Sequence, residues 1–215
     1  MYKYFLKRVI DFVFSFFGLL ILSPIFLVVT LLLFFANKGT PFFVQDRPGK
    51  NGKIFYVLKF KTMNDDKDSM GELLPDKDRI TKIGKFVRKT SLDEIPQLWN
   101  VLKGDMSLIG PRPLRTFYLP FYSLKEQRRH NVRPGITGLA QVSGRNFLKW
   151  EQRFAYDLEY IEKLSFWLDA KIIYKTFLKV IKSSDVATDP DEFVESFHIY
   201  RQQQIDSGIF EHEQQ

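Results

Sequence analysis

The N-terminal part of the chain contains an apolar run that a folded protein must bury or place in a membrane. Residues 12–36 include no charged side chain, and these 25 positions exceed the roughly 20 apolar residues that cross a bilayer core. A cleaved signal peptide fits poorly, because its apolar region is only about 7–15 residues long. Hydropathy alone therefore favours a single helix that crosses the membrane.

Two features favour a different path through the membrane. Ser23-Pro24 lies at the centre of the run, where proline removes a backbone hydrogen bond. Basic residues flank both ends, so the positive-inside rule gives no orientation for a spanning helix; they are Lys3, Lys7, Arg8, Lys38, Arg47, Lys50 and Lys53. The alternative is a re-entrant helix–break–helix over residues 1–38, with both ends cytoplasmic and Ser23 satisfying a carbonyl freed by the break. The residues leave both paths open, and irregular backbone at membrane depth needs protein or polar cover.

The rest of the chain predicts an α+β fold that is mostly helical and contains one small β-hairpin. Two aromatic-rich runs flank Gly49-Lys50-Asn51-Gly52, and Asn-Gly is a strong signal for a hairpin over residues 40–63. Residues 64–79 predict a polar surface loop or lid. Residues 80–102 and 149–182 predict helices, with Gly104 ending the first of these segments.

Charge divides the part after the apolar run into a basic body, residues 39–184, and an acidic tail, residues 185–215. Eight of the 25 acids and one of the 32 bases follow Ser184, and we expect the tail to be solvated and partly disordered. A basic body binds phosphate on nucleic acid, on a membrane surface or on a nucleotide. The helix over 165–182 is basic and amphipathic, and it lies either at a headgroup boundary or on an ordinary core. Cysteine is absent, which excludes disulfides, thiolate zinc ligands and a thiol nucleophile.

Residues 88–97 hold the densest group of reactive side chains. Ser91 and Glu94 have the spacing of a capping box, but Pro96 would then fall inside the helix. A cap nearer Asp93 places Pro96 in the first turn and puts Asp93 at the positive end of the helix dipole. We expect this setting, beside Arg88, to lower the pKa of Asp93, which could then act as a nucleophile or a magnesium ligand.

Two further basic positions carry either structure or phosphate binding. Arg112 lies between two prolines in a rigid turn, which suits a bidentate phosphate clamp or a purely structural loop. Lys59 shares a strand face with Lys61, as on a solvated edge strand or at a phosphate site. The sequence has no Walker motif and no GxGxxG.

Three blocks in this order resemble the bacterial sugar transferases, the small monotopic phosphoglycosyl transferases. They are residues 59–63 (KFKTM), 90–113 (TSLDEIPQLWNVLKGDMSLIGPRP) and 133–146 (RPGITGLAQVSGRN), and they follow an apolar run broken at Ser23-Pro24. The likeness extends to about Lys182 and is closest to the minimal catalytic members of the family. The residues after Ser184 lie outside it.

The resemblance implies an enzyme that moves a sugar-1-phosphate from a UDP-sugar to undecaprenyl phosphate, uses Mg²⁺ and releases UMP. It implies that Asp93 is the nucleophile and a metal ligand, that Glu94 is its catalytic partner and that Ser23-Pro24 marks a re-entrant helix. It further implies substrate-binding roles for Lys59, Arg88, Arg112, Arg133, Gln141 and Arg145. The enzyme would be monotopic in the bacterial inner membrane, with its catalytic domain on the cytoplasmic face.

Two other classes of protein remain as alternatives. A basic, aromatic-rich body is also typical of nucleic-acid binding, but the aromatic residues concentrate in the apolar run rather than among the basic residues. A non-catalytic membrane scaffold would not need Asp93 and Glu94 beside arginines. We therefore expect no nucleic-acid partner, and we expect an enzyme that works at the membrane boundary.

Overall fold

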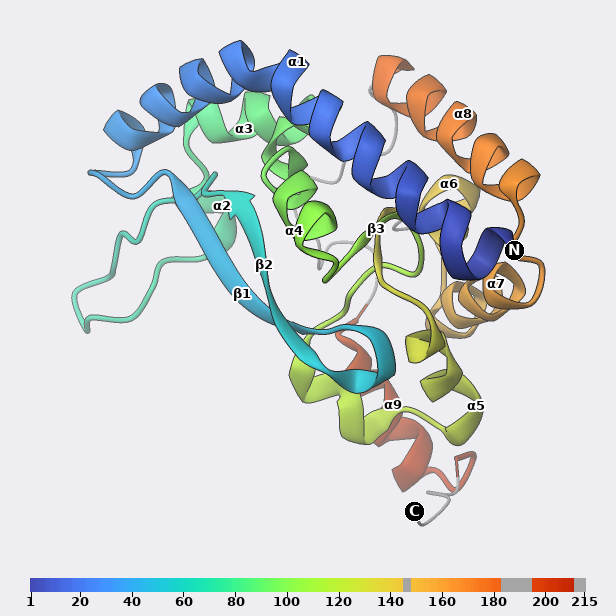
Figure 1. The fold of residues 1–215 in the computed structure, drawn as a ribbon. Helices are drawn as coiled ribbons and strands as arrows, with labels where there is room; N and C mark the ends of the chain where they lie inside the picture. The colour runs from blue at the N-terminus through green and yellow to red at the C-terminus, as the bar shows by residue number, and fades with distance from the viewer. Residues whose placement is uncertain (145–147, 183–194, 211–215) are drawn as a thin grey trace.

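The computed structural model describes residues 1–144, 148–182 and 195–210 (Figure 1). The described chain is mainly helical with short strands, as expected. The α-helices are α1 (Lys7–Ala36), α2 (Asp76–Arg79), α3 (Lys82–Lys89), α4 (Gln97–Lys103), α5 (Leu124–Gln127), α6 (Leu139–Ser143), α7 (Trp150–Glu162), α8 (Phe166–Lys182) and α9 (Phe197–Asp206). The π-helical turn η1 (Tyr2–Leu6) precedes α1, and the 3₁₀ turns are η2 (Lys50–Gly52), η3 (Leu92–Glu94), η4 (Thr116–Phe121) and η5 (Arg128–Asn131).

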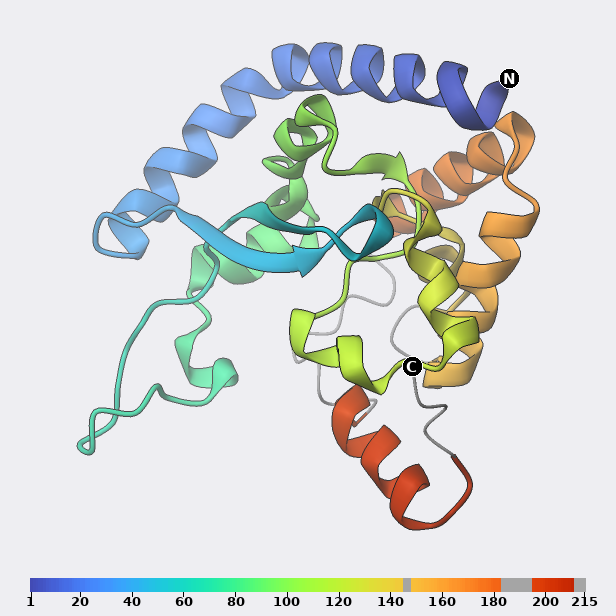
Figure 2. The ribbon, with the colours of Figure 1, turned by 60° about the horizontal axis from the view of Figure 1, so that its bottom comes forward.

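The apolar run forms α1, which is long and apolar enough to cross a membrane by length and composition. The expected break is wrong in one respect: α1 continues through Pro24 without interruption and bends in its middle part instead (Figures 1 and 2). Pro24 has no N–H for the carbonyl of Leu20, one turn earlier, and the Ser23 hydroxyl donates to that carbonyl at 2.8 Å. The serine therefore satisfies the group that the proline leaves open, so the helix bends without breaking.

Both ends of α1 form polar contacts with the rest of the chain. Near its start, the Arg8 guanidinium donates to the carbonyls of Val101 and Leu102, and buried Asp11 accepts from the Ser107 hydroxyl at 2.7 Å. At its end, the Asn37 amide donates to the Lys61 carbonyl. These contacts therefore tie both ends of the 30-residue helix to the same domain.

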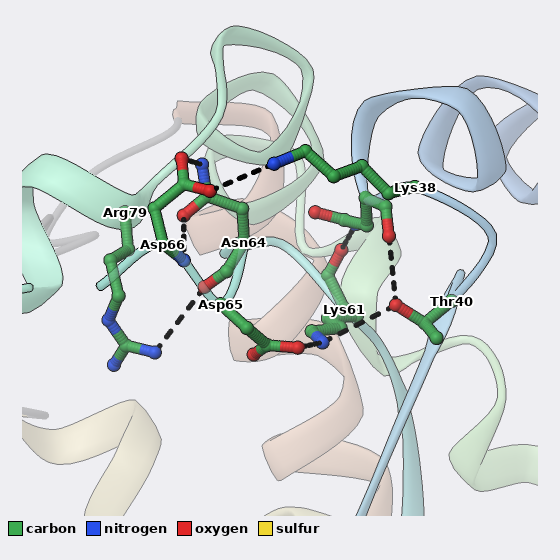
Figure 3. A network of polar contacts seen from close by, with 8 residues as sticks. Lys38, Thr40, Lys61, Asn64, Asp65, Asp66 and Arg79 are labelled. Atoms are coloured by element: carbon green, nitrogen blue, oxygen red, sulfur yellow. Dashed lines mark hydrogen bonds and ion pairs between the residues drawn. The ribbon is translucent and has the colours of Figure 1, made fainter. Parts of the chain in front are cut away.

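A second polar network fixes the chain just after α1 (Figure 3). The Lys38 ammonium lies 3.2 Å from the Asp66 carboxylate, and Lys61 pairs with Asp65. These contacts hold the start of the 64–79 loop against the end of α1.

The inner face of α1 belongs to a hydrophobic core of the domain. Val29 and Leu33 are buried against Phe60, Val87 and Ile95. The outer face of α1 leaves large apolar side chains exposed, and α8 adds more, including Trp167 and Phe177. Both helices lie on the same side of the molecule, at the top of Figure 1. This layer is an extensive exposed apolar surface of the kind that marks a membrane or partner contact.

The expected hairpin is confirmed. Strands β1 (Phe42–Pro48) and β2 (Ile54–Phe60) pair antiparallel, with Phe43 opposite Lys59 and Gln45 opposite Val57. Phe55 and Val57 are buried, so the face of β2 that carries Lys59 turns toward the domain. The solvated-edge interpretation of Lys59 is therefore wrong.

A second, unexpected sheet joins two of the sequence blocks. Strand β3 (Ser107–Ile109) pairs in parallel with β4 (Gly135–Thr137). The two backbone segments approach each other closely. A Cβ on Gly135 would lie 2.1 Å from the Gly110 nitrogen, and a Cβ on Gly138 would lie 2.2 Å from the Gly110 oxygen. Glycine is required at these positions because no other side chain fits between the backbones.

The expected solvated tail is wrong for the described part of residues 185–215. Helix α9 packs against η4 and α7, and Phe197 is fully buried among Tyr118, Tyr122 and Trp150. The Arg201 guanidinium is also buried and pairs with Glu126 at 2.6 Å. The acidic stretch directly after Ser184 lies outside the described residues. The expectation of a solvated tail relied on its polar composition, but the packing of Phe197 against aromatic side chains holds α9 on the domain.

Candidate active site

Asp93 and Glu94 lie on the short turn η3, between α3 and α4. Ser91 has a positive φ of 56° and makes no capping hydrogen bond, so the capping-box interpretation is wrong. Pro96 is the N-cap residue of α4, so the helix starts later than the expected cap near Asp93, and Pro96 precedes the first turn instead of lying in it. The turn therefore presents the two carboxylates just before the helix rather than within it. Its neighbours Leu92 and Ile95 belong to the core beneath α1, which places the carboxylates beside the apolar layer.

Two cations from distant parts of the chain converge on Glu94. The Lys59 ammonium, from β2, donates to Oε1 of Glu94 at 2.9 Å, and the Arg112 guanidinium donates to the same oxygen at 3.1 Å. Lys59 also lies 4.0 Å from Oδ2 of Asp93. Both carboxylates are largely shielded, with 18% and 19% of their side chains exposed. The site thus combines two adjacent carboxylates with two bound cations.

The pKa values of the two carboxyl groups shift in opposite directions. Burial and the charge of Glu94 raise the pKa of Asp93 to about 6, against the lowering effect of Lys59, Arg112 and Arg88. Burial also opposes ionisation of Glu94, but the charges and hydrogen bonds of Lys59 and Arg112 outweigh it and hold the pKa of Glu94 below its usual range. The expected lowering of the Asp93 pKa by a helix dipole is therefore wrong. At neutral pH Asp93 is still mostly ionised.

Arg88 reaches the site from α3. Its Nε donates to the Thr62 hydroxyl at 2.8 Å, at the end of the hairpin, and its charge acts on Asp93. The KFKTM block therefore contributes Lys59 directly and orients Arg88 through Thr62. The structure thus brings five of the predicted site residues together: Lys59, Arg88, Asp93, Glu94 and Arg112.

The loop that carries Arg112 is held by residues that the sequence analysis missed. The Arg129 guanidinium donates to the Arg112 carbonyl at 2.8 Å and pairs with Asp157 of α7 at 2.7 Å. Arg129 and Asp157 are 4% and 3% exposed. A buried ion pair of this kind persists only when its geometry is well satisfied. No sequence signal linked these two positions, because they lie 28 residues apart in segments without a shared motif.

The other predicted binding residues are placed differently. Nε of Arg133 donates to the Gly104 carbonyl, at the end of α4, and its charge acts on Arg8 of α1. The Gln141 amide donates to the Ile136 carbonyl, while its buried Oε1 has no hydrogen-bond partner among the residues that the structure describes. Neither residue contacts the two carboxylates. Arg145 lies outside the described residues.

The carboxylates fit a magnesium ion that is shared with a substrate. Among the described residues, no group of three or more His, Cys, Asp or Glu side chains could hold a metal ion alone. Mg²⁺ is commonly bound by one or two carboxylates, with substrate phosphates and water completing the shell. Within the same residues, neither oxygen of Asp93 accepts a hydrogen bond, so this carboxylate has lone pairs available for a ligand.

Comparison with known proteins adds an independent line of evidence. The profile of the bacterial sugar transferase family matches residues 2–183. A Bacillus subtilis (strain 168) protein named "Uncharacterized sugar transferase EpsL" is 50% identical over 182 residues, which cover 84% of this chain and 90% of that protein. The Sinorhizobium fredii exopolysaccharide production protein ExoY is 37% identical, over 82% of this chain and 86% of that protein.

Longer relatives also match most of this chain. The Klebsiella pneumoniae UDP-glucose:undecaprenyl-phosphate glucose-1-phosphate transferase is 44% identical over 80% of this chain but only 39% of its own length. The matched region thus contains α1, both small sheets, the η3 carboxylates and the Arg112 loop, and it ends before α9. On this evidence the chain belongs to the bacterial sugar transferase family.

Proposed function

We propose that the protein transfers a sugar-1-phosphate from a UDP-sugar to undecaprenyl phosphate, with Mg²⁺ and with release of UMP, and so starts the assembly of a glycan on a lipid carrier. Relatives named for glucose-1-phosphate transfer to undecaprenyl phosphate support the reaction class. The observation that carries the proposal is the position of Asp93. It is a mostly ionised carboxylate without a hydrogen-bond donor among the described residues, beside three cations and next to the core that contains α1.

The environment of Asp93 fits a nucleophile better than that of Glu94 does. Glu94 is neutralised by Lys59 and Arg112, which hold its carboxylate in place. Asp93 keeps its lone pairs and a raised pKa, so it is the more basic of the two carboxylates. We therefore assign attack to Asp93 and the positioning of Lys59 and Arg112 to Glu94.

The reaction then proceeds in two displacements. An Asp93 oxygen forms a bond to the β-phosphorus of the UDP-sugar, and the bond from this phosphorus to the bridging oxygen breaks, with its electron pair leaving on UMP. An oxygen of the lipid phosphate next attacks the same phosphorus, and the Asp93 carboxylate leaves unchanged. This division into two steps is the logic of covalent catalysis. Lys59, Arg88 and Arg112 stabilise the charge that shifts between phosphates, and a bound Mg²⁺ would supply further electrostatic stabilisation.

The arrangement of α1 supports a re-entrant path on the cytoplasmic face of the inner membrane. Both ends of α1 bind the same domain, through Arg8 and Asp11 at the start and Asn37 at the end. A spanning helix would place one of these ends across the bilayer from its partners. The exposed faces of α1 and α8 would then lie in one leaflet, where the lipid phosphate can reach η3.

Trapping the covalent intermediate tests the proposed chemistry. Protein in nanodiscs incubated with a UDP-sugar and Mg²⁺, without lipid acceptor, should release one UMP per active site and gain a sugar-phosphate mass on the peptide that contains Asp93. Asp93→Asn should abolish both signals, and Glu94→Gln should slow them. Asp78→Asn, which alters an exposed carboxylate away from the site, is the matched control. UMP release only after lipid is added, with no adduct, would reject the covalent step.

Cysteine labelling tests the topology. The sequence has no native cysteine, so single cysteines at exposed Lys3 and Lys50 report only on their own positions. A re-entrant α1 places both on the cytoplasmic side, where an impermeant thiol reagent should label neither in intact cells and both after permeabilisation. Labelling at Lys3→Cys alone in intact cells would mean that α1 spans the membrane.

A further inference from the structure

A second group of arginines gathers near Arg112, because the charges of Arg112 and Arg115 both act on Arg47. Arg47 comes from β1, and Arg115 directly precedes η4. Among the described residues, neither has an acidic side chain within 4.0 Å. Asp46, which binds the Thr116 hydroxyl, offsets part of the repulsion between these arginines, but Arg47 and Arg115 together still outnumber it, so the net positive charge favours binding of an anion.

The hairpin register turns Arg47 toward the site. Arg47 pairs with Phe55 and Gln45 with Val57, so both polar side chains share the domain-facing side of the hairpin with Lys59. The Arg47 guanidinium donates to Oε1 of Gln45 at 2.5 Å, and Gln45 lies two residues nearer the Lys59 end of the strand pair. This hydrogen bond holds the guanidinium on the domain-facing side of the hairpin.

Contacts between β1 and η4 bring Arg115 to the same place. The Thr116 hydroxyl bonds to the Asp46 carboxylate, and the Arg115 guanidinium lies 5.6 Å from the centre of the Phe117 ring. Burial and the charges of Arg112 and Arg115 lower the pKa of Arg47 to about 10, which is consistent with a concentrated positive potential.

The position of Arg47 along the hairpin separates this arginine group from the exposed apolar surface of α1 and α8. The Phe42–Phe60 pair packs against Phe26 of α1, so this end of the hairpin lies on the apolar helix. Arg47 lies five residues further along β1, which corresponds to about 16 Å, whereas Lys59 lies one residue from Phe60. An anion at Arg47 is therefore on the side away from α1, where a soluble nucleotide rather than a lipid headgroup would enter.

We propose that Arg47 and Arg115 form a second anion subsite, which holds the phosphate of the departing nucleotide while Lys59 and Arg112 hold the phosphate that is transferred. The inference rests on the proposed function. When Asp93 bonds to the β-phosphorus, the broken P–O bond leaves its electron pair, and one additional negative charge, on the nucleotide phosphate. Arg47 and Arg115 face that charge as it develops, so they stabilise the leaving group and retain UMP until the second step.

Measuring the binding of the product UMP tests this subsite independently of catalytic turnover. The affinities of UMP and of uridine should be measured by calorimetry on the full chain in nanodiscs, for wild type, Arg47→Gln, Arg115→Gln and Arg47→Lys. Arg128→Gln is the control, because this exposed arginine makes only a surface ion pair with Glu162. Loss of one charge-assisted hydrogen bond to phosphate, at about 1.5–3 kcal/mol, corresponds to a fall of about tenfold or more in UMP affinity.

We expect Arg47→Gln and Arg115→Gln each to lower the affinity for UMP about tenfold and to leave the affinity for uridine unchanged. Arg47→Lys should give an intermediate UMP affinity, and Arg128→Gln should bind UMP like wild type. An unchanged thermal midpoint must accompany the loss, because a misfolded variant would lose uridine as well. Equal UMP affinity in wild type and both glutamine variants would overturn the subsite and leave the proposed function standing. No UMP binding by wild type would overturn both. A raised KM for lipid phosphate with unchanged UMP affinity would assign Arg47 to the acceptor instead and reject the inference.

Discussion

Nζ of Lys59 lies 2.9 Å from Oε1 of Glu94, although 35 residues separate them in the chain. The contact joins the hairpin to the η3 turn and leaves Glu94 as a fixed anion whose charge is already balanced. Its neighbour Asp93 lies 4.0 Å from the same ammonium and has the higher pKa of the two. Two adjacent carboxylates thus differ in pKa, and their environments rather than their chemistry separate them.

The raised pKa of Asp93 predicts a pH dependence for the first chemical step. In the proposed mechanism the ionised carboxylate attacks, so the rate of adduct formation should fall about tenfold per pH unit as the pH drops below about 6. Single-turnover UMP release without lipid measures this step alone and avoids the acceptor phosphate, whose second pKa is also about 6. A rate that remains constant down to pH 4.5 would contradict the assignment.

The same raised pKa predicts that Asp93→Asn stabilises the fold. A carboxyl group with a folded pKa above its unfolded value costs stability when ionised; this cost decreases as the pH falls below the folded pKa and disappears below the unfolded pKa. At pH 7 the neutral asparagine should therefore raise the free energy of unfolding, by up to about 3 kcal/mol for a shift of roughly two units. Thermal unfolding at pH 7 and at pH 5 tests this, and the gain should shrink at the lower pH. An equal gain at both values would exclude a charge effect.

Arg112→Lys should impair turnover although it retains the positive charge. The arginine reaches Glu94 from a loop whose backbone is fixed by Arg129, and lysine lacks the planar fork that binds phosphate bidentately. We expect kcat/KM for the UDP-sugar to fall at least about tenfold, and Arg112→Ala to lower it further. Steady-state kinetics decide the matter, since a lysine variant within twofold of wild type would reduce Arg112 to a long-range charge.

Ser23 and Pro24 should be coupled in a double-mutant cycle. Ser23→Ala leaves the Leu20 carbonyl without its donor at a bend in the apolar helix, which should cost about 1–3 kcal/mol. In a Pro24→Ala background the new backbone N–H donates to Leu20, so the same serine substitution should cost almost nothing. Thermal unfolding of the four proteins in nanodiscs gives the coupling energy. Additive effects would mean that the serine hydroxyl does not compensate for the proline.

Phe197→Ala should destabilise the domain even though α9 follows the region that matches the family. The ring is fully buried among Tyr118, Tyr122, Trp150 and Phe154, and its removal should cost about 3–5 kcal/mol. Ile209→Ala is the control, because this side chain is exposed near the end of the same segment. Equal unfolding midpoints for both variants would show that α9 contributes little to the core.

Local signals in the sequence predicted the local parts of the fold. The Asn-Gly pair and the aromatic alternation specify the hairpin, and Gly104, with φ of 93°, ends α4 where expected. The β3–β4 pair escaped prediction because each strand has three residues and no period, and its pairing depends on a close approach of glycines 25 residues apart. The packing of helix α9 was not predicted, because its composition is mostly polar and its contact with the core depends on Phe197, whose partners come from η4 and α7.

The site was predictable to a similar extent. Asp93, Glu94 and Arg112 stand in recognisable motifs, but nothing local indicates that Lys59 faces them, since this depends on which hairpin face packs against the domain. The direction of the Asp93 pKa shift was wrong because burial, which a sequence does not reveal, outweighs the helix dipole. The Arg129–Asp157 pair has no motif at all, and only the folded chain brings it to the Arg112 carbonyl.

The burial of Val29 and Leu33 against Phe60, Val87 and Ile95 limits how this protein can be engineered. In many membrane enzymes the anchor can be cut away to leave a soluble catalytic fragment. Here a cut after Ala36 would uncover the core next to η3 and remove Asp11 from Ser107, so the remainder would lose part of its interior as well as its anchor. The apolar helix α1 and the turn that carries the carboxylates form one folding unit, and chimeras between relatives should exchange them together.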